Sequence, residues 1–466
     1  MKRFWLVLLS LGLVMAFSVS AFAVDVKVSG EYYAAGLYLN KTEVVNDNVY
    51  RGTGTARVLV DKADESTAFY FQRLRIGTDF IVSPCLKLVT RFDAMERIWG
   101  GARSAAGTAD AQSAGSREEN QNIAFDLAYI SYTSPIGLFL VGYQPDYEWG
   151  TVFGNRTSGP TAGQLTYEVP IGPVILVAQY AKETDKSISA VTTGVTTDQD
   201  DDSYRLGAIY KFGTDKAKGE VGGLLLFNRY AGSKADYAGA TDIGHLTNAY
   251  KLIPYFKTQF GPVAFQGEFE YTFGDAVKME NSALSSHNVD ISAWSAFLDA
   301  TVTFGPVYFG GSFVYLSGDD PATKDKAEGG AGVNTAGLDW NPCLIMFNTI
   351  DTQYWVGSID GHDGSVIDNE MSNIYFFQGR VGVKPIPQLD TMLSVSYGTA
   401  DKKPTDYVNG SYGWEIDATG TYKITNNLSY MLGIGYLFTG DYYKGTNNNN
   451  KTVDDYMIIN KLTLSF

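Results

Sequence analysis

Segments in which apolar and polar side chains alternate run from Lys27 to the end of the chain. In segment 262–273, Val263, Phe265, Phe269, Tyr271 and Phe273 share one face, and Gln266, Glu268, Glu270 and Thr272 share the other. Successive side chains of a strand point to opposite sides, so this period of two predicts strands with one apolar and one polar face. Segment 411–424 alternates in the same way, with Tyr412, Trp414, Ile416, Ala418 and Tyr422 on one face and Glu415, Asp417, Thr419 and Lys423 on the other. In segment 427–439, one face holds Leu428, Tyr430, Leu432, Ile434, Tyr436 and Phe438.

Short turns alternate with long polar insertions along these segments. Gly and Pro set the turn dihedrals and interrupt the strand ladder. Eight short turns and nine long loops predict eighteen strands, with a range of 16 to 20 because segment 163–169 is short and loop 317–372 could hide a hairpin. The short turns are expected near 83–84, 134–137, 172–173, 213–215, 261–262, 305–306, 385–387 and 426–427.

The apolar face of such strands needs a cover, and the pattern offers no helices to provide one. A soluble sandwich would need a second sheet over that face. In a bilayer the apolar face meets lipid, but only a closed sheet satisfies its own backbone there. The chain is rich in aromatic residues, and several stand at predicted strand ends, as membrane-interface girdles require. We therefore expect an all-β fold, a transmembrane antiparallel up-and-down barrel over residues 24–466; the end aromatics are Phe80, Trp99, Tyr132, Phe212, Phe260 and Phe304.

The two ends of the chain point to export. Lys2 and Arg3 precede an apolar run and Ala21-Phe22-Ala23, which predicts a cleaved secretory signal peptide over residues 1–23, the alternative being a core helix or an uncleaved anchor. The last segment alternates apolar residues up to a terminal Phe466 and looks like the C-terminal signal of outer-membrane barrels. The expected location is the cell outer membrane, in contact with lipid and lipopolysaccharide.

The charge balance argues against a nucleic-acid partner. Removing Lys2 and Arg3 leaves 34 of the 36 basic residues against 51 acidic ones, a formal net charge of −17. If the apolar face meets lipid, the polar face must surround water, because unpaired charges in a dry core cost too much free energy. The residues predicted to line the lumen are Arg73, Arg75, Asp79, Lys87, Arg91, Asp93, Arg97, Asp126, Arg205, Lys211, Arg380 and Lys384.

Two stretches resemble the general porins of Gram-negative bacteria. Segments 71–77 and 87–92 look like the arginine-bearing wall of that family, and 141–155 is similar to the strand that runs into its third loop. The resemblance implies that this loop folds inward and that Asp146 and Glu148 face the arginines across the pore. The chain departs from the family at Phe125-Asp126, where a further arginine is common, and in its long 317–372 loop.

The resemblance implies a water-filled channel for passive diffusion of small hydrophilic solutes and ions, and a homotrimer. The charges lining the wall would set ion preference; alternatively, they pair with one another and have no selective effect. Another hypothesis is a substrate-selective channel, or a barrel around a partner protein.

The long loop contains the apolar stretch 340–347 and competes with loop 148–163 as the constriction. It would fold into the pore, hold a neighbouring subunit or cover the barrel mouth. It also holds Cys343, whereas Cys85 lies in the first short turn. Because a disulfide needs Cα atoms within about 7 Å, we expect both cysteines to be unpaired.

An outer-membrane hydrolase is the competing class of function. It would need a histidine beside an acid or a serine, and the three histidines are His245, His287 and His362, all in predicted loops. Asp360-Gly361-His362-Asp363-Gly364 is a weak acid–histidine cluster, but Asp-Gly repeats are also ordinary turn chemistry. No haem-attachment or EF-hand motif is present, so we predict no catalytic, cofactor-binding or metal site.

Overall fold

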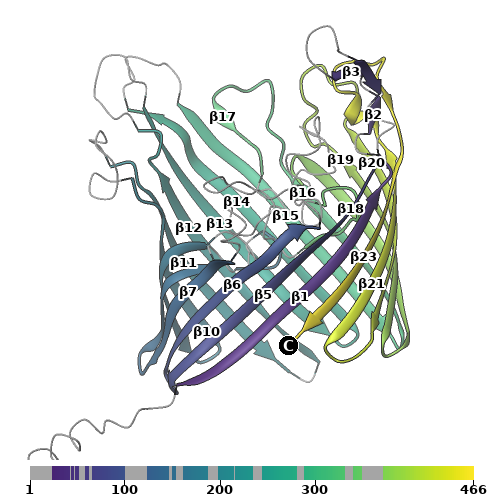
Figure 1. Cartoon of the computed structure of the whole chain (residues 1–466). Coiled ribbons are helices and arrows are strands. Elements are labelled where there is room, and N and C mark those ends of the chain that lie inside the picture. The colour runs from purple at the N-terminus through teal and green to yellow at the C-terminus, as the bar shows by residue number, and fades with distance from the viewer. Residues whose placement is uncertain are drawn as a thin grey trace, which may run out of the picture.

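Eighteen long strands form one closed antiparallel barrel in the computed structural model (Figure 1). The strand count predicted from the turn spacing is confirmed. The structure describes residues 24–41, 44–46, 48–51, 58–61, 66–99, 123–145, 149–153, 161–186, 198–214, 216–234, 244–280, 288–330, 340–348 and 371–466. The expected signal peptide, residues 1–23, lies outside these ranges, as do His287 and the cluster around His362.

Strands adjacent in sequence pair with each other around the whole barrel. β1 closes the ring because it pairs with β5 on one side and with β23 on the other, so that Tyr33 stands opposite both Arg73 and Thr463. The barrel strands in order are β1 Asp25–Leu39, β5 Thr67–Ser83, β6 Leu86–Ile98, β7 Ile123–Ser134, β8 Gly137–Pro145, β9 Thr161–Ile171, β10 Val174–Thr184, β11 Asp201–Gly213, β12 Ala217–Tyr230, β13 His245–Phe260, β14 Val263–Met279, β15 Val289–Phe304, β16 Val307–Leu316, β18 Ile374–Ile386, β19 Leu389–Thr399, β20 Ser411–Lys423, β21 Leu428–Thr439 and β23 Asp455–Ser465.

Short elements stand at the long-loop end of the barrel. They are β2 Val45–Asn46, β3 Asn48–Arg51, β4 Val58–Asp61, β17 Lys326–Ala327, β22 Lys451–Thr452 and the 3-10 helix η5 Asp441–Lys444. β17 makes a short parallel pairing with β15 and is not a further barrel strand. Among the described residues, no helix has the length and apolar character needed to cross a bilayer.

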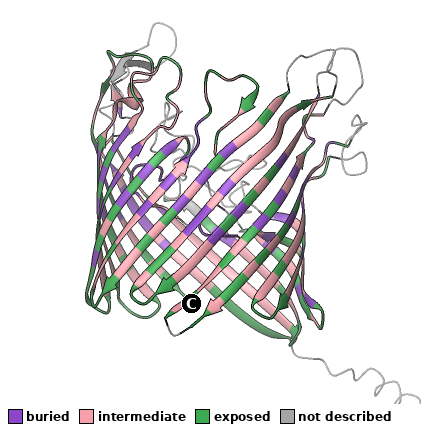
Figure 2. Ribbon diagram, turned by 180° about the vertical axis from the view of Figure 1, so that it is seen from behind, coloured by how far each residue is buried: buried purple, intermediate pink, exposed green. Residues whose placement is uncertain are grey.

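Exposed and buried residues alternate along the strands, as Figure 2 shows. On β20, Trp414 is 51% exposed, whereas Glu415 beside it is 0% exposed. The outer surface of a barrel faces the solvent or the lipid and the inner surface faces the lumen, so the exposed apolar residues lie outside and the acids inside. This confirms the predicted faces of 262–273 and 427–439 and nearly all of 411–424.

Tyr412 is the exception, because it is buried although the alternation predicted it beside Trp414 on the outer face. The register between β19 and β20 shifts between Gly398 and Thr399, and Gly413 has a φ of +124°. This bulge inserts one residue into the alternation, so Tyr412 turns inward.

Glycine makes the repeated short turns possible. Gly172, Gly261 and Gly305 each begin a two-residue loop with Pro, and their φ values are +59°, +55° and +56°. A positive φ at this place matches the right-handed twist of paired strands and is costly for other residues. The predicted turns are confirmed; that between β18 and β19 is centred on Pro387 and Gln388, slightly later than expected.

Candidate functional site: the lumen

Two chain segments fold into the lumen from the long-loop end. Residues 149–153 follow β8, and residues 340–348 belong to the long loop after β16. We call them the first and second inward segments. Both contribute to one buried apolar cluster on the inner wall; besides Val152, Phe153, Ile345, Met346 and Phe347, it includes Tyr33, Leu37, Phe71, Phe297, Leu316, Phe376, Tyr412 and Ile459.

The first inward segment is fixed to the wall by Glu268 of β14. Oε2 of this carboxylate accepts hydrogen bonds from the N–H groups of Thr151 at 2.7 Å, Val152 at 2.7 Å and Phe153 at 3.2 Å. Trp149 donates from Nε1 to the carbonyl oxygen of Ile253 at 3.1 Å. Since β8 and β14 are not neighbours in the barrel, the segment crosses part of the lumen to reach this anchor.

Glu415 of β20 fixes the second inward segment in the same manner. Its Oε1 accepts from the N–H groups of Leu344 at 2.9 Å and Ile345 at 2.7 Å, and its Oε2 accepts from Met346 at 2.6 Å. Gln378 adds a hydrogen bond from Nε2 to the carbonyl oxygen of Pro342 at 2.6 Å. Of the three positions considered for the apolar stretch 340–347, the structure has it inside the pore.

The charged residues of β5, β6 and β7 come together on the inner wall. Arg75 makes a bidentate contact with Asp93, with both hydrogen bonds 2.6 Å long. Arg91 binds Asp126 at 2.6 Å through Nη2 and at 2.9 Å through Nε. Asp126 also lies 3.7 Å from Nη2 of Arg75, so the two pairs form one network.

Two further cations extend this wall, which we call the charged wall. Lys87 pairs with Asp79 at 2.8 Å, and Arg73 lies 3.9 Å from Glu31 and over the ring of Tyr33. The charges are therefore paired, as the alternative hypothesis supposed, and their effect on ion selectivity stays a prediction. The charged wall consists of Arg73, Arg75, Lys87, Arg91, Asp93 and Asp126.

The remaining predicted site residues are not described. Asp146 and Glu148 lie outside the described residues, and so does the side chain of Arg97. Their expected place opposite the arginines stays a prediction. Asp126 itself sits where the register of β6 and β7 shifts, between the Arg91 and Phe92 pairs, and it bonds to Arg91 in the lumen.

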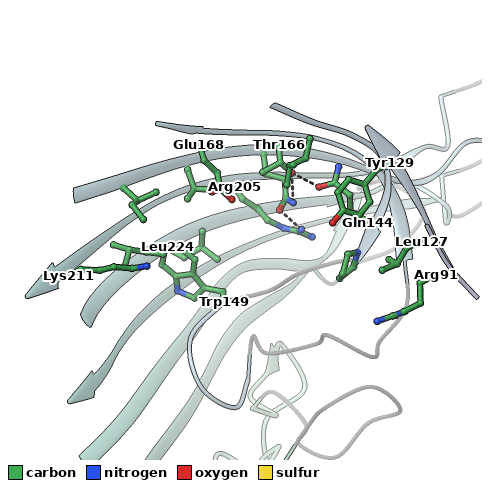
Figure 3. Close-up of a pocket in the computed structure, with 16 residues that line it drawn as sticks. Arg91, Leu127, Tyr129, Gln144, Trp149, Thr166, Glu168, Arg205, Lys211 and Leu224 are labelled. Carbon is green, nitrogen blue, oxygen red and sulfur yellow. Dashed lines mark hydrogen bonds between the residues drawn. The ribbon is translucent and has the colours of Figure 1, made fainter. Parts of the chain in front are cut away.

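A cavity of about 360 Å³ opens beside the charged wall, along β6 to β12 (Figure 3). Figure 3 shows Arg205 between Arg91 at one end and Lys211 at the other. Of the side chains that line it, three are cationic and one, Glu168, is acidic. Uncharged hydrogen-bonding groups come from Tyr129, Gln144, Thr166 and Gln179, and apolar ones from Leu127, Leu140, Pro145, Trp149, Ile175, Val177, Ile209 and Leu224.

Arg205 is the most buried of these cations and is held by two neighbours. It donates from Nη1 to Oε1 of Gln179 at 2.7 Å, and its Nη2 lies 3.4 Å from Glu183. The alternation predicted that Arg205 and Lys211 face the lumen. It did not indicate the cavity, since the lining residues come from seven strands and the first inward segment.

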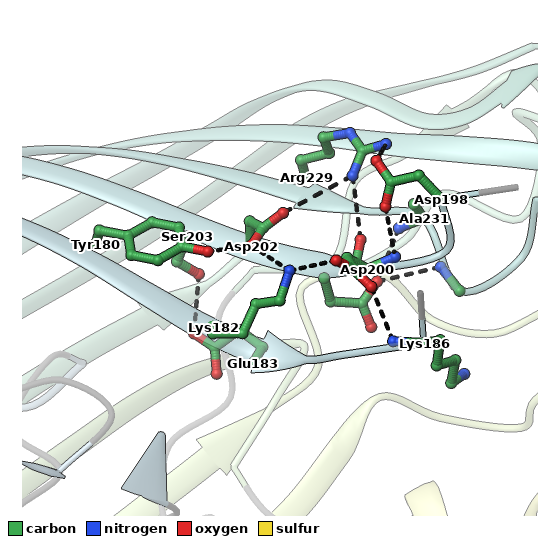
Figure 4. Close-up of polar contacts among 12 residues, drawn as sticks. Tyr180, Lys182, Glu183, Lys186, Asp198, Asp200, Asp202, Ser203, Arg229 and Ala231 are labelled. Atoms are coloured by element: carbon green, nitrogen blue, oxygen red, sulfur yellow. Dashed lines mark hydrogen bonds and ion pairs between the residues drawn. The ribbon is translucent and has the colours of Figure 1, made fainter. Parts of the chain in front are cut away.

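The acidic run 198–202 is tied to neighbouring strands at the long-loop end (Figure 4). Lys182 binds Asp200 and also lies 3.2 Å from Asp202, while Arg229 lies 2.9 Å from Asp198. Partial burial opposes ionisation of Asp200, but the hydrogen bonds from Lys182 and the Lys186 N–H lower its pKa below the ordinary value. These acids therefore lock the ends of β10, β11 and β12 together.

A closed eighteen-stranded barrel with an apolar outer surface and a charged lumen is the architecture of outer-membrane porins of Gram-negative bacteria. Among solved structures, the fold is similar to OccK9 (OpdG) of Pseudomonas aeruginosa, with 16% identity, a TM-score of 0.49, and 94% of this chain and 99% of that chain covered. It is also similar to OpdQ of the same species, with 12% identity, a TM-score of 0.47, and 95% and 97% covered. A BenF-like porin from Pseudomonas fluorescens Pf-5 has 11% identity, a TM-score of 0.47, and 94% and 99% covered. No family model matches the sequence, and no curated protein does.

Proposed function

We propose that the chain is an outer-membrane channel through which small hydrophilic solutes and ions diffuse passively. The observation that carries the proposal is the cavity beside the charged wall, where Arg91, Glu168, Arg205 and Lys211 reach the same space. Charged side chains of this density require water around them, because a dry lumen would leave them poorly solvated. The proposed function includes no catalytic step.

The proposed path runs along β6 to β12. Both inward segments contribute to the apolar cluster on the inner wall, which takes in residues of β1, β5, β15, β16, β18, β20, β21 and β23. The charged wall and the residues that line the cavity are not part of this cluster. Size selection would then come from the first inward segment, whose Trp149 lines the cavity, and the second segment would narrow the lumen from the other side.

Planar-bilayer recording tests this proposal directly. The purified full chain should insert with discrete current steps, and liposomes that contain it should swell in small sugars but not in large oligosaccharides. A barrel that inserts, as judged by heat-modifiable electrophoresis, yet passes neither ions nor sugars would refute the channel. The two alternatives, a barrel around a partner protein and an outer-membrane hydrolase, would then take its place.

The cation excess in the cavity favours a second candidate, a channel selective for small anionic solutes. Arg91 binds Asp126 and Arg205 lies 3.4 Å from Glu183, but three cationic side chains line the cavity and Glu168 is its one acidic lining residue. Reversal potentials in a salt gradient distinguish the candidates: a general channel would pass both ions with similar permeability, and a selective one would favour the anion.

Assembly is a separate part of the proposal. We extend the porin resemblance to a homotrimer in contact with lipopolysaccharide. Native mass spectrometry of the detergent-purified chain should then show three copies. A single copy at all detergent concentrations would contradict the trimer without affecting the channel.

A further inference from the structure

Cys343, Glu415 and Asp417 meet inside the barrel. Their ligand atoms, one sulfur and a carboxylate oxygen from each acid, all lie within 4.8 Å of one another. Cys343 belongs to the second inward segment, and the two acids stand two residues apart on the inner face of β20. All three residues are at most 2% exposed.

Unsatisfied polar atoms surround the same point. Among the described residues, neither carboxylate oxygen of Asp417 nor Oγ of Ser394 makes a hydrogen bond of ordinary length and angle, although the Leu344 N–H and the Ser394 hydroxyl lie near Asp417. Ser394 is 1% exposed and stands directly opposite Asp417 in the register of β19 and β20. A buried polar atom without a partner costs about 1–3 kcal/mol, and more if it is charged. Three such atoms lie close together here, beside the sulfur of Cys343.

The electrostatics of the two acids favour a bound cation. Both oxygens of Glu415 accept main-chain N–H groups of the second inward segment. Asp417 lies beside it on the same face, with no cationic side chain paired to either acid among the described ion pairs. Two neighbouring buried acids can both carry a negative charge only if a cation compensates them, and a divalent ion between them would do so.

The chemistry of the three donor atoms limits which ions the cluster can bind. Thiolate sulfur with carboxylate oxygen suits borderline and soft divalent ions such as Zn²⁺ and Cd²⁺, whereas Mg²⁺ and Ca²⁺ prefer oxygen alone. Three protein ligands would leave the fourth position of a tetrahedral site open.

We propose that Cys343, Glu415 and Asp417 form a binding site for a zinc-like divalent ion, which fastens the second inward segment to β20. Binding releases the thiol proton of Cys343 to solvent and forms one metal–sulfur bond, without any change of oxidation state. The sequence alone does not indicate this site, because the cysteine and the two acids are about seventy residues apart and the cysteine is single. This inference does not depend on the proposed channel function.

The test uses the full chain in detergent, treated with a chelator and then titrated with Cd²⁺ and, separately, Zn²⁺. Cys85→Ser removes the exposed thiol of the first short turn and leaves Cys343 as the one thiol in the chain. This variant should bind one ion per chain and show the sulfur-to-cadmium charge-transfer absorption. Because the variant leaves the proposed site intact, the absence of that absorption overturns the proposal even before any ligand is changed.

Ligand variants made in the Cys85→Ser chain complete the test. Asp417→Asn and Cys343→Ser should each weaken Zn²⁺ binding at least about tenfold. Glu270→Gln, a similar change to a buried acid on another strand, should leave it unchanged. Equal affinity in all variants would overturn the proposed ligands. Folding of each variant is checked by heat-modifiable electrophoresis. If a ligand variant does not fold, the charge-transfer absorption of the Cys85→Ser chain alone supports or overturns the proposed site.

Discussion

Glu268 and Glu415 each hold an inward segment by the same device. In both, one carboxylate accepts three consecutive main-chain N–H groups, those of residues 151–153 for Glu268 and residues 344–346 for Glu415. Hydrogen bonds to a charged group contribute about 1.5–3 kcal/mol each, so a single side chain can fix a loop that has no strand partners.

Glu415→Gln and Glu268→Gln should therefore release their segments. Glutamine offers one acceptor oxygen, and its amide donors oppose the N–H groups that the carboxylate accepted. We expect each variant to show a larger and noisier single-channel conductance than the unmodified chain. Glu280→Gln is the matched control, because Glu280 lies at the long-loop end of the barrel, and it should leave the current steps unchanged. If both lumen variants conduct like the control, the inward segments do not limit the current.

Arg75 and Asp93 are predicted to be energetically coupled. Their bidentate contact is mostly buried, and removing one partner leaves the other charge poorly compensated. In a double-mutant cycle with Arg75→Ala and Asp93→Ala, urea titration should give a coupling free energy of about 1–3 kcal/mol. The exposed pair Lys384 and Asp390 serves as the comparison and should give less than about 1 kcal/mol.

Arg205 is predicted to influence ion preference. Arg205→Gln keeps a hydrogen-bonding side chain beside Gln179 but removes one positive charge from the cavity. The permeability ratio of chloride to potassium, obtained from the reversal potential, should fall about two- to tenfold, because one desolvated charge contributes about 0.5–1.4 kcal/mol. Lys324→Gln removes an exposed charge at the long-loop end and should change the ratio little at high salt, where exposed charges are screened.

How much the sequence could predict depends on how local each feature is. The strands, their faces and the short turns follow from alternation and from Gly-Pro, which act within a few residues. The alternation also predicted that Arg75, Asp93 and Asp126 face the lumen, where they form part of the charged wall. It failed at Tyr412, because a bulge shifts the period by one residue without a strong sequence signal.

Tertiary contacts account for what the sequence could not predict. Glu268 and Glu415 were expected to face the lumen, but nothing nearby in the sequence indicates that they bind loops 116 and 70 residues away. The apolar character of 340–347 did suggest a contact surface. Which surface it covers depends on the positions of β18 and β20, which only the folded barrel brings together.

The contact between Asp320 and Lys402 should respond to pH at both extremes. The N–H of Ala322 and the Lys402 ammonium lower the pKa of Asp320 below its ordinary 3.8, and Asp320 raises the pKa of Lys402 above 10.5. The stabilisation from Asp320 is present above pH 3.8 and is lost as pH falls through its lowered pKa. That from Lys402 is present below pH 10.5 and is lost as pH rises through its raised pKa.

We therefore expect the two loops that carry this pair to stay together between about pH 4 and pH 10.5. Spin labels at Lys324 and Thr405 of a Cys85→Ser chain can report their separation. The distance distribution should broaden at either pH extreme and not in between. An Asp320→Asn chain should already be broad at neutral pH; a narrow distribution there would mean that other contacts hold these loops.

Gly413 is predicted to be the residue that permits the bulge turning Tyr412 inward. Its φ of +124° is rarely adopted by other residues, and an added Cβ would lie 2.2 Å from the carbonyl oxygen of Phe438. Gly413→Ala should lower the free energy of unfolding by about 1–3 kcal/mol, measured by urea titration. Gly379→Ala is the control, because the corresponding Cβ meets nothing within 4 Å and the backbone is not strained. Equal stability of the two variants would show that the bulge adapts to a side chain, and Tyr412 would then owe its inward position to the apolar cluster.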